Sequence, residues 1–274
     1  DGWHNGIFTK KSSATIKKKN TEVRKKAAAH IKALEKGKSV NADELISEIN
    51  TECEKMNAYV YNEATAILAD GKIPALIGGD HSTPLGLIKA LGEKHGGFGI
   101  LQIDAHADLR DAYEGFTYSH ASIMYNALQN EQVKKLVQVG VRDICDDEIN
   151  LINGSNRRVV TYFNHEIKDA VFNVINWTAI CRQIVEELPK KVYISFDIDG
   201  LDQRYCPNTG TPVPGGLAYE QAVYLLNEII TSGREIIGFD LVEVAPGDDE
   251  WDAIVGARML YKMCNLALKS KTNA

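Results

Sequence analysis

The sequence predicts an α/β fold with a mainly parallel sheet and helices on both of its faces. Short apolar runs alternate with amphipathic stretches of helical period from about residue 41 to residue 269, as in successive strand–helix units. The run at residues 98–103 is almost entirely apolar, as expected of a strand buried inside a parallel sheet. Polar clusters follow several of these runs, at the carboxyl ends of strands where such sheets bind ligands.

Length and composition favour one catalytic domain that spans residues 1–274. With 44% hydrophobic residues, the chain can bury a large single core. It has no apolar run of about 18 residues and no visible signal peptide, and its five scattered cysteines form no CxxC pair. We therefore expect a cytoplasmic protein with reduced thiols and no membrane partner. Because the sequence opens at Asp1 without Met, it is either processed or the C-terminal part of a longer chain.

The net charge of −6 is unevenly distributed. Residues 10–38 contain eleven Lys or Arg and two Glu, a local charge of +9, which leaves −15 on the remainder. Contact with a nucleic acid or another partner is one explanation of such a basic stretch, although no nucleic-acid partner is expected. A solvated helix face is the favoured interpretation, because no aromatic residues interleave with the lysines.

Two helices are expected before the first strand. Residues 21–36 favour a helix that stops at Gly37. The second helix should begin near Asn41, which forms a capping-box pattern with Glu44, and should end at Gly71. Its apolar residues recur every three or four positions and form one core-facing stripe: Leu45, Ile49, Cys53, Met56, Val60, Ala64 and Leu68.

Strands and helices then alternate along the rest of the chain. The apolar runs predict strands at residues 73–77, 98–103, 136–141, 158–162, 192–196 and 236–242. Helical periodicity predicts helices at residues 83–94, 119–130, 176–188, 218–232 and 251–269.

The run at residues 98–103 leads directly into Asp104, His106 and Asp108. Alternate residues of an extended backbone point the same way, so these three side chains converge on one point. Buried carboxylates without partners cost several kcal/mol or more. A multivalent cation is the expected compensator, and a loop of solvated acids is the alternative.

Three other strand ends contribute similar groups. His81 follows two glycines, Asp197 and Asp199 follow the run at 192–196, and Glu243 follows the run at 236–242. Each signal alone is weak, because loop histidines and Asp-x-Asp caps are common. Together with Asp104, His106 and Asp108, these strand ends supply four Asp and two His. That number exceeds the capacity of one tetrahedral ion and favours two divalent ions, Mn²⁺ above thiolate-loving metals. Such a pair can activate a bridging water, which predicts a hydrolase.

The combined motifs resemble the ureohydrolases, that is, arginase, agmatinase and formimidoylglutamase. The resemblance covers roughly residues 40–270, and the 118–121 and 210–216 segments look closest to the agmatinase branch. Its motifs are Gly78-Gly-Asp-His81, Asp104-Ala-His-Ala-Asp108, Ser119-His-Ala121, Ser195-Phe-Asp-Ile-Asp-Gly-Leu-Asp202, Gly210-Thr-Pro-Val-Pro-Gly-Gly216 and Glu243. The family's N-terminal strand and Gly-Pro-x-x-Ile-Arg helix have no match in residues 1–40.

This resemblance implies a three-layer arginase-like fold, two Mn²⁺ per chain, and hydrolysis of a small cationic guanidino substrate to urea and an amine. It assigns the first ion to His81, Asp104, Asp108 and Asp197, and the second to Asp104, His106, Asp197 and Asp199. His120 would shuttle protons, Asp108 would also accept a hydrogen bond from the reacting centre, and Glu243 would hold the guanidinium. The resemblance also implies a homo-oligomer, a trimer or a hexamer.

Three alternatives to an agmatinase-like enzyme are compatible with parts of the sequence. Within the family, the substrate could be arginine, a guanidino acid or formiminoglutamate. A one-zinc deacetylase needs only Asp, His and Asp as ligands, so His81 and Asp199 argue against it. A non-catalytic homologue would be expected to have lost a metal ligand, whereas all six residues are present.

Overall fold

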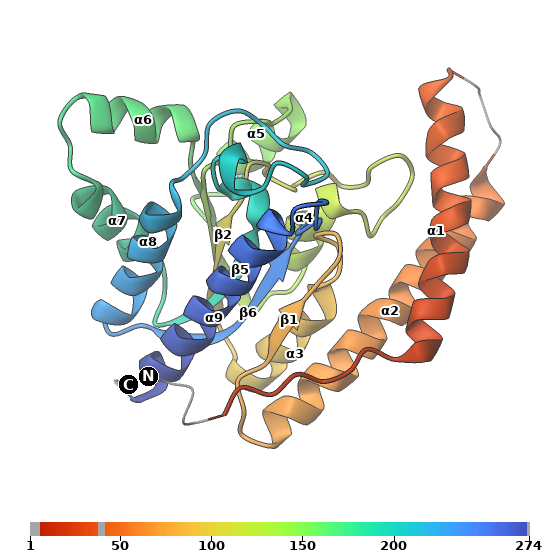
Figure 1. The fold of residues 1–274 in the computed structure, drawn as a ribbon, viewed down its shortest axis with the longest axis horizontal. Helices are drawn as coiled ribbons and strands as arrows, with labels where there is room; N and C mark the ends of the chain where they lie inside the picture. Colours follow the sequence, from red (N-terminus) through yellow and green to blue (C-terminus); the bar gives the residue numbers. More distant parts are fainter. Residues whose placement is uncertain (1–5, 38–41, 273–274) are drawn as a thin grey trace.

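The computed structural model describes residues 6–37 and 42–272 and contains a six-stranded sheet (Figure 1). The strand order is β1-β6-β5-β2-β3-β4, and every neighbouring pair is parallel. The predicted parallel α/β architecture is confirmed. The strands are β1 (Ala75–Ile77), β2 (Phe98–Ile103), β3 (Val133–Val139), β4 (Val159–Tyr162), β5 (Lys191–Asp197) and β6 (Glu235–Val242).

Helices cover both faces of the sheet, because alternate residues of each buried strand face opposite cores. Along β2, Phe98 and Ile100 belong to one apolar cluster, whereas Leu101 and Ile103 belong to the other. The first cluster packs against α2 (Asp43–Ala69), α3 (Leu85–His95) and α4 (Ile123–Leu128). The second packs against α7 (Trp177–Glu186), α8 (Tyr219–Thr231) and α9 (Trp251–Thr272). The result is a three-layer sandwich.

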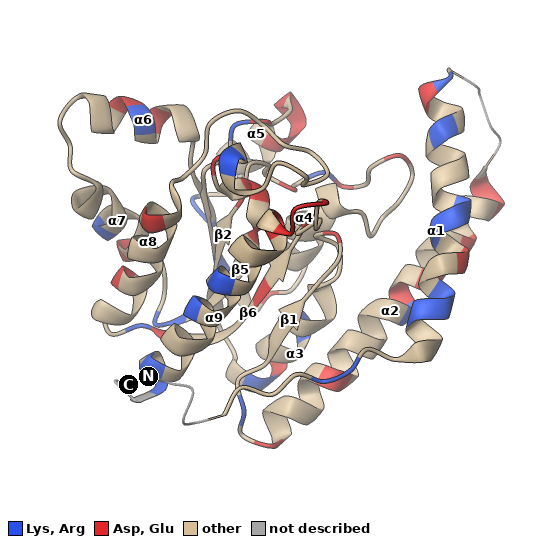
Figure 2. Ribbon diagram, viewed as in Figure 1, with Lys and Arg blue, Asp and Glu red and all other residues tan. Residues whose placement is uncertain are grey.

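Helix α1 (Ala14–Glu35) lies along α2 at one side of the molecule (Figure 1). Lysines of α1 face acidic residues of α2 (Figure 2), and Lys26–Glu48 and Lys19–Glu52 form ion pairs. Within α1, the basic stretch is therefore a helix face, and part of its charge is balanced inside the chain.

The boundaries of these two helices differ in part from expectation. The first helix begins at Ala14, whereas the sequence predicted a start at residue 21. Its lysine-rich first turns face solvent and have no apolar periodicity, so no pattern in the sequence marked them as helical. Gly37 follows its end with a φ of 64°, as expected of a helix stop. The second begins at Asp43, while its expected cap, Asn41, lies outside the described residues.

Several other boundaries also differ. Residues 119–130 begin as a 3-10 turn, His120–Ser122, before α4. β3 starts at Val133, three residues before the predicted start of the strand. Two lysines among its first residues interrupt the apolar run, so the sequence pattern did not include this part of the strand. Two short helices, α5 (Asp146–Gly154) and α6 (Asn164–Phe172), were not expected. Each buries only one residue, so neither has a strong apolar stripe.

The sheet topology places β6, β5 and β2 side by side, with β1 beyond β6. Because all strands are parallel, their carboxyl ends meet at one edge of the sheet, where the predicted ligands follow. Among the described residues, no helix is long and apolar enough to span a membrane. All five cysteines are free thiols.

Candidate metal centre

Asp104, directly after β2, lies between two imidazoles. Its Oδ2 is 3.0 Å from Nδ1 of His81, and its Oδ1 is 3.5 Å from Nδ1 of His106. The ligand atoms form two compact groups that share this carboxylate: His81, Asp104 and Asp197, and Asp104, His106 and Asp199. The arrangement fits a pair of cations joined by a bridging carboxylate.

The tautomer of His81 can be worked out from its neighbours. The Ser195 hydroxyl donates to Oδ2 of Asp240 at 2.9 Å. Its oxygen, 2.9 Å from Nε2 of His81, must therefore accept the Nε2 proton. The Nδ1 atom of a neutral His81 then carries a lone pair, as a metal ligand requires.

The surroundings of His81 Nδ1 are suited to a cation. Oxygens of Asp108, Asp104 and Asp197 lie 2.9, 3.0 and 3.4 Å away, yet none is aligned for a hydrogen bond with this buried nitrogen. A lone pair and three carboxylates repel one another unless a proton or a cation lies between them.

The second group is built on the turn that follows β5. Asp199 Oδ1 accepts the Ala105 amide proton at 3.0 Å, while its Oδ2 is buried without a hydrogen-bond donor, 3.2 Å from Nδ1 of His106. The Asp199 amide donates to Oδ1 of Asp197 at 2.9 Å, which leaves Asp197 Oδ2 toward His81. A bridging role for Asp197 therefore stays a prediction.

Without cations, the charges in this site strongly perturb one another. Burial and the charge of Asp104 raise the pKa of Asp108 to about 7. Burial lowers the pKa of His106, but Asp104 and Asp199 outweigh it and raise the pKa to about 11. Burial, with the charges of Asp199 and Asp104, raises the pKa of Asp197 well above its usual value. A site so rich in carboxylates favours multivalent cations.

Glu243 lies beside His81 at the end of β6. Its Oε1 accepts the His81 amide proton at 2.9 Å, and its own amide donates to the Gly79 carbonyl at 2.8 Å. Burial raises the pKa of its carboxyl group to about 7. Its backbone has a φ of 59°, and that of Asp108 has 55°, which is an uncommon conformation for residues with a side chain. Such strain is concentrated at functional sites.

His120 begins the 3-10 turn that Ser119 caps. The ring of Tyr113 contacts its imidazole edge-on, with centroids 5.8 Å apart. Burial lowers the pKa of His120, and the nearby charges of His106 and His81 lower it further against the opposing effect of Asp80. His120 therefore lies within electrostatic reach of both ligand groups, and its role as a proton shuttle stays a prediction.

No role was predicted for several residues around the ligands, although Ser195 stands in one of the motifs. Ser195 and Asp240 support His81, and Gln102 donates to Oδ2 of Asp104 at 2.8 Å. Gln102 had a visible signal, since it is a polar residue within an otherwise apolar strand. The partners of Ser195 and Asp240 depend on how β5 and β6 pair, which no local pattern shows.

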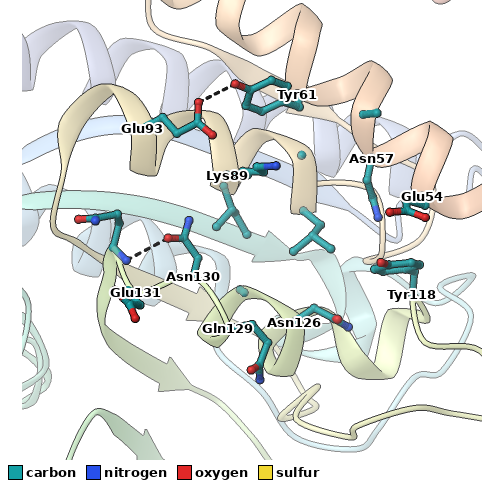
Figure 3. A pocket seen from close by; sticks show the side chains of 16 residues that line it. Glu54, Asn57, Tyr61, Lys89, Glu93, Tyr118, Asn126, Gln129, Asn130 and Glu131 are labelled. Carbon is teal, nitrogen blue, oxygen red and sulfur yellow. Dashed lines mark hydrogen bonds between the residues drawn. The ribbon is translucent and has the colours of Figure 1, made fainter.

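A cavity of about 690 Å³ lies elsewhere, between α2, α3 and the α4 segment (Figure 3). Tyr61 and Lys89 line one wall, and Asn126 and Tyr118 line another. None of the predicted site residues lines it. The cavity and the candidate metal centre are therefore separate features.

The arginase family model matches residues 10–265. The N(1)-aminopropylagmatine ureohydrolase of Thermus thermophilus is 35% identical over 227 residues, which are 83% of this chain and 73% of the relative. The agmatinase of Cronobacter sakazakii is 33% identical, over 80% of this chain and 66% of its own length.

Solved structures agree with these relatives. The agmatine ureohydrolase of Thermoplasma volcanium superposes with a TM-score of 0.68 and 27% identity, covering 80% of this chain and 71% of that one. The arginase of Medicago truncatula gives a TM-score of 0.67 and 28% identity, covering 81% and 69%. With the sheet, the ligand set and the matched length in agreement, the chain belongs to the arginase family.

Proposed function

We propose that this ureohydrolase cleaves a C–N bond of an agmatine-like guanidino compound and releases urea and an amine. The observation that carries the proposal is the position of Asp104 between His81 and His106, each with further carboxylates around it. The named relatives, which include agmatinases and an aminopropylagmatine ureohydrolase, support the class of substrate.

Two Mn²⁺ ions are the proposed cofactors. Oxygen-rich ligands with a minority of imidazole suit Mn²⁺. The first ion is assigned to His81, Asp104, Asp108 and Asp197, and the second to Asp104, His106, Asp197 and Asp199. When bound, such a pair supplies an activated water and Lewis-acid stabilisation of developing charge.

The protein's own residues would bind the substrate and move its protons. Glu243, beside His81 at the end of β6, would hold a planar guanidinium through paired hydrogen bonds. Asp108 would accept a hydrogen bond from the reacting centre. His120 would supply the proton that the leaving amine needs before the C–N bond breaks.

The rival functions fit the geometry less well. A one-zinc deacetylase site would not need His81 and Asp199, yet both lie within the two ligand groups. A non-catalytic homologue would have no need to keep six ionisable ligands in a largely buried cluster.

A urea-release assay on a panel of compounds tests the proposal. The panel contains agmatine, N(1)-aminopropylagmatine, arginine, 4-guanidinobutyrate and formiminoglutamate, each with the Mn²⁺-loaded protein. We expect the cationic amines to have the highest kcat/KM and metal analysis to give about two equivalents per chain. Full activity with one firmly bound zinc would contradict the proposal. The predicted trimer or hexamer is tested separately by light scattering.

A further inference from the structure

Three polar side chains cross the interior of the sheet beside Asp104. Gln102 on β2, Gln138 on β3 and Thr161 on β4 occupy paired register positions on adjacent strands. Both glutamine side chains are completely buried. We call these three residues the amide relay.

The relay is a continuous line of hydrogen bonds that ends on Asp104. The Thr161 hydroxyl donates to Oε1 of Gln138 at 2.7 Å, and Nε2 of Gln138 donates to Oε1 of Gln102 at 2.6 Å. Nε2 of Gln102 then donates to Oδ2 of Asp104 at 2.8 Å.

The direction of this line is fixed by groups that can only accept. Nε2 of Gln102 also donates to the His106 carbonyl at 3.3 Å, and Nε2 of Gln138 donates to the Ala107 carbonyl at 2.7 Å. Because carboxylates and carbonyls have no proton to give, both amides must turn their NH₂ ends toward residues 104–107. Both amide oxygens then face away, so Thr161 must act as the terminal donor.

This directed arrangement does more than fill the core. A buried amide is costly unless its hydrogen bonds are made, and apolar residues would pack the strand interiors without that cost. Aligned donors along a chain polarise one another, so each bond strengthens the next. The line converges on the carboxylate shared by the two ligand groups, and its side branches hold the backbone of the loop that carries His106.

We propose that the amide relay is a positioning device for the metal centre. It holds Asp104 so that Oδ2 faces His81 and Oδ1 faces His106, and it thereby sets the affinity of both metal positions together. Thr161, on β4 and remote from the ligands in sequence, is a positioning residue for both ions. This inference rests on the proposed two-metal function.

Thr161→Val is the decisive variant, because Val keeps the shape of Thr and Thr161 is only partly buried. It removes the terminal donor and leaves Oε1 of Gln138 unpaired. We expect Mn²⁺ affinity to fall about 10-fold or more at both positions, in the range found when groups that support metal ligands are removed. Thr161→Ser keeps the hydroxyl and should bind Mn²⁺ as the wild type does.

Two further variants act as controls. Ser195 bonds His81 and Asp240, and His81 is the only one of these two that is a proposed ligand, so Ser195→Ala should weaken chiefly the first ion. Thr231→Val removes an exposed hydroxyl that bonds only the Asn227 carbonyl in α8, so it should change neither affinity. The relay predicts that Thr161→Val loses Mn²⁺ affinity at both positions, whereas Ser195→Ala loses it chiefly at the first. This difference distinguishes the relay from a local defect.

The measurements are Mn²⁺ dissociation constants by chelator competition and the melting temperature of the metal-free protein. If the relay positions Asp104, Thr161→Val raises both Mn²⁺ dissociation constants, and Thr161→Ser keeps both at the wild-type values. Wild-type Mn²⁺ affinity in Thr161→Val, or a lower melting temperature without any change in affinity, would overturn the relay and leave the proposed function standing. Fewer than two Mn²⁺ equivalents in the wild type would overturn the proposed function itself, and the relay with it.

Discussion

At the scale of single residues, Asp104 differs from the other proposed ligands because each of its oxygens faces a different imidazole. His81, in contrast, belongs to one ligand group only. Replacing these two residues should therefore have unequal effects on metal content.

We predict that Asp104→Ala loses both Mn²⁺ ions and all measurable activity, whereas His81→Asn chiefly empties one position. Asp197→Ala should resemble Asp104→Ala if Asp197 also bridges. Metal analysis of the purified variants measures the result. Loss of both ions from His81→Asn with neither lost from Asp197→Ala would show that the ligand assignment is wrong.

Glu243→Gln isolates the charge at the proposed guanidinium site. Gln keeps the shape and can still accept the His81 amide proton. We predict intact metal content and a loss of about 10²-fold or more in kcat/KM for guanidino substrates, because a positioning charge is removed. Glu44→Gln, on the exposed face of α2, is the matched control and should be silent. Near-normal turnover would place the guanidinium elsewhere.

His120→Asn tests the proton shuttle. The lowered pKa keeps His120 neutral at pH 7, and once protonated it is a strong donor. We predict that kcat falls by roughly 10²–10⁴ with metal content intact, and that added imidazole partly restores the rate. His165→Asn, an exposed histidine, is the control. Metal loss in His120→Asn would instead indicate a structural role.

At the scale of secondary-structure elements, α1 and α2 hold the loop that approaches His120. Nε2 of His30 in α1 donates to the Glu114 carbonyl at 3.2 Å. Asn50 in α2 donates to the Gly115 carbonyl at 3.3 Å and accepts the Thr117 amide proton at 3.0 Å. The same loop carries Tyr113, which contacts His120. The helix pair thus supports the loop that contacts His120.

Asn50→Leu should loosen this loop. It removes two hydrogen bonds worth about 1 kcal/mol each at most positions. We predict an increase in KM of up to roughly tenfold with unchanged metal content. Faster hydrogen exchange in residues 113–118 should accompany it. Thr51→Ala, which removes only a local bond to the Ser47 carbonyl, is the control. If hydrogen exchange in this loop becomes faster while KM stays unchanged, the loop does not contribute to substrate binding.

A feature can be predicted from the sequence when neighbours along the chain decide a residue's environment. The apolar runs predict all six strands, and with them the strand ends after which Asp104 and Asp199 lie. A feature whose partner lies far away in sequence cannot be predicted in this way. The pairing of α1 with α2 depends on contacts between Lys26 and Glu48, and the amide relay depends on strand register. Neither leaves a local periodic signal.

At the scale of the whole molecule, the metal ions should stabilise the fold, because they bind the native site and offset its clustered carboxylates. One ligand at 100 times its dissociation constant adds about 2.7 kcal/mol, so two such ions add about 5 kcal/mol. For a chain of this size, that corresponds to roughly 10–20 °C in melting temperature. We predict that chelation lowers the melting temperature by this amount and that Mn²⁺ restores it. Asp104→Ala should show no response to Mn²⁺.

The strand order has a consequence for biosynthesis. β6 is the last of the six described strands along the chain, yet it lies between β1 and β5 and pairs with both. His81 and Glu243 can therefore meet only after the final strand has inserted between two earlier ones. Such long-range parallel pairing folds slowly. A chain in which β6 has not yet paired would hold the aspartates of β2 and β5 without their completed frame, so we expect metal binding only after β6 has inserted.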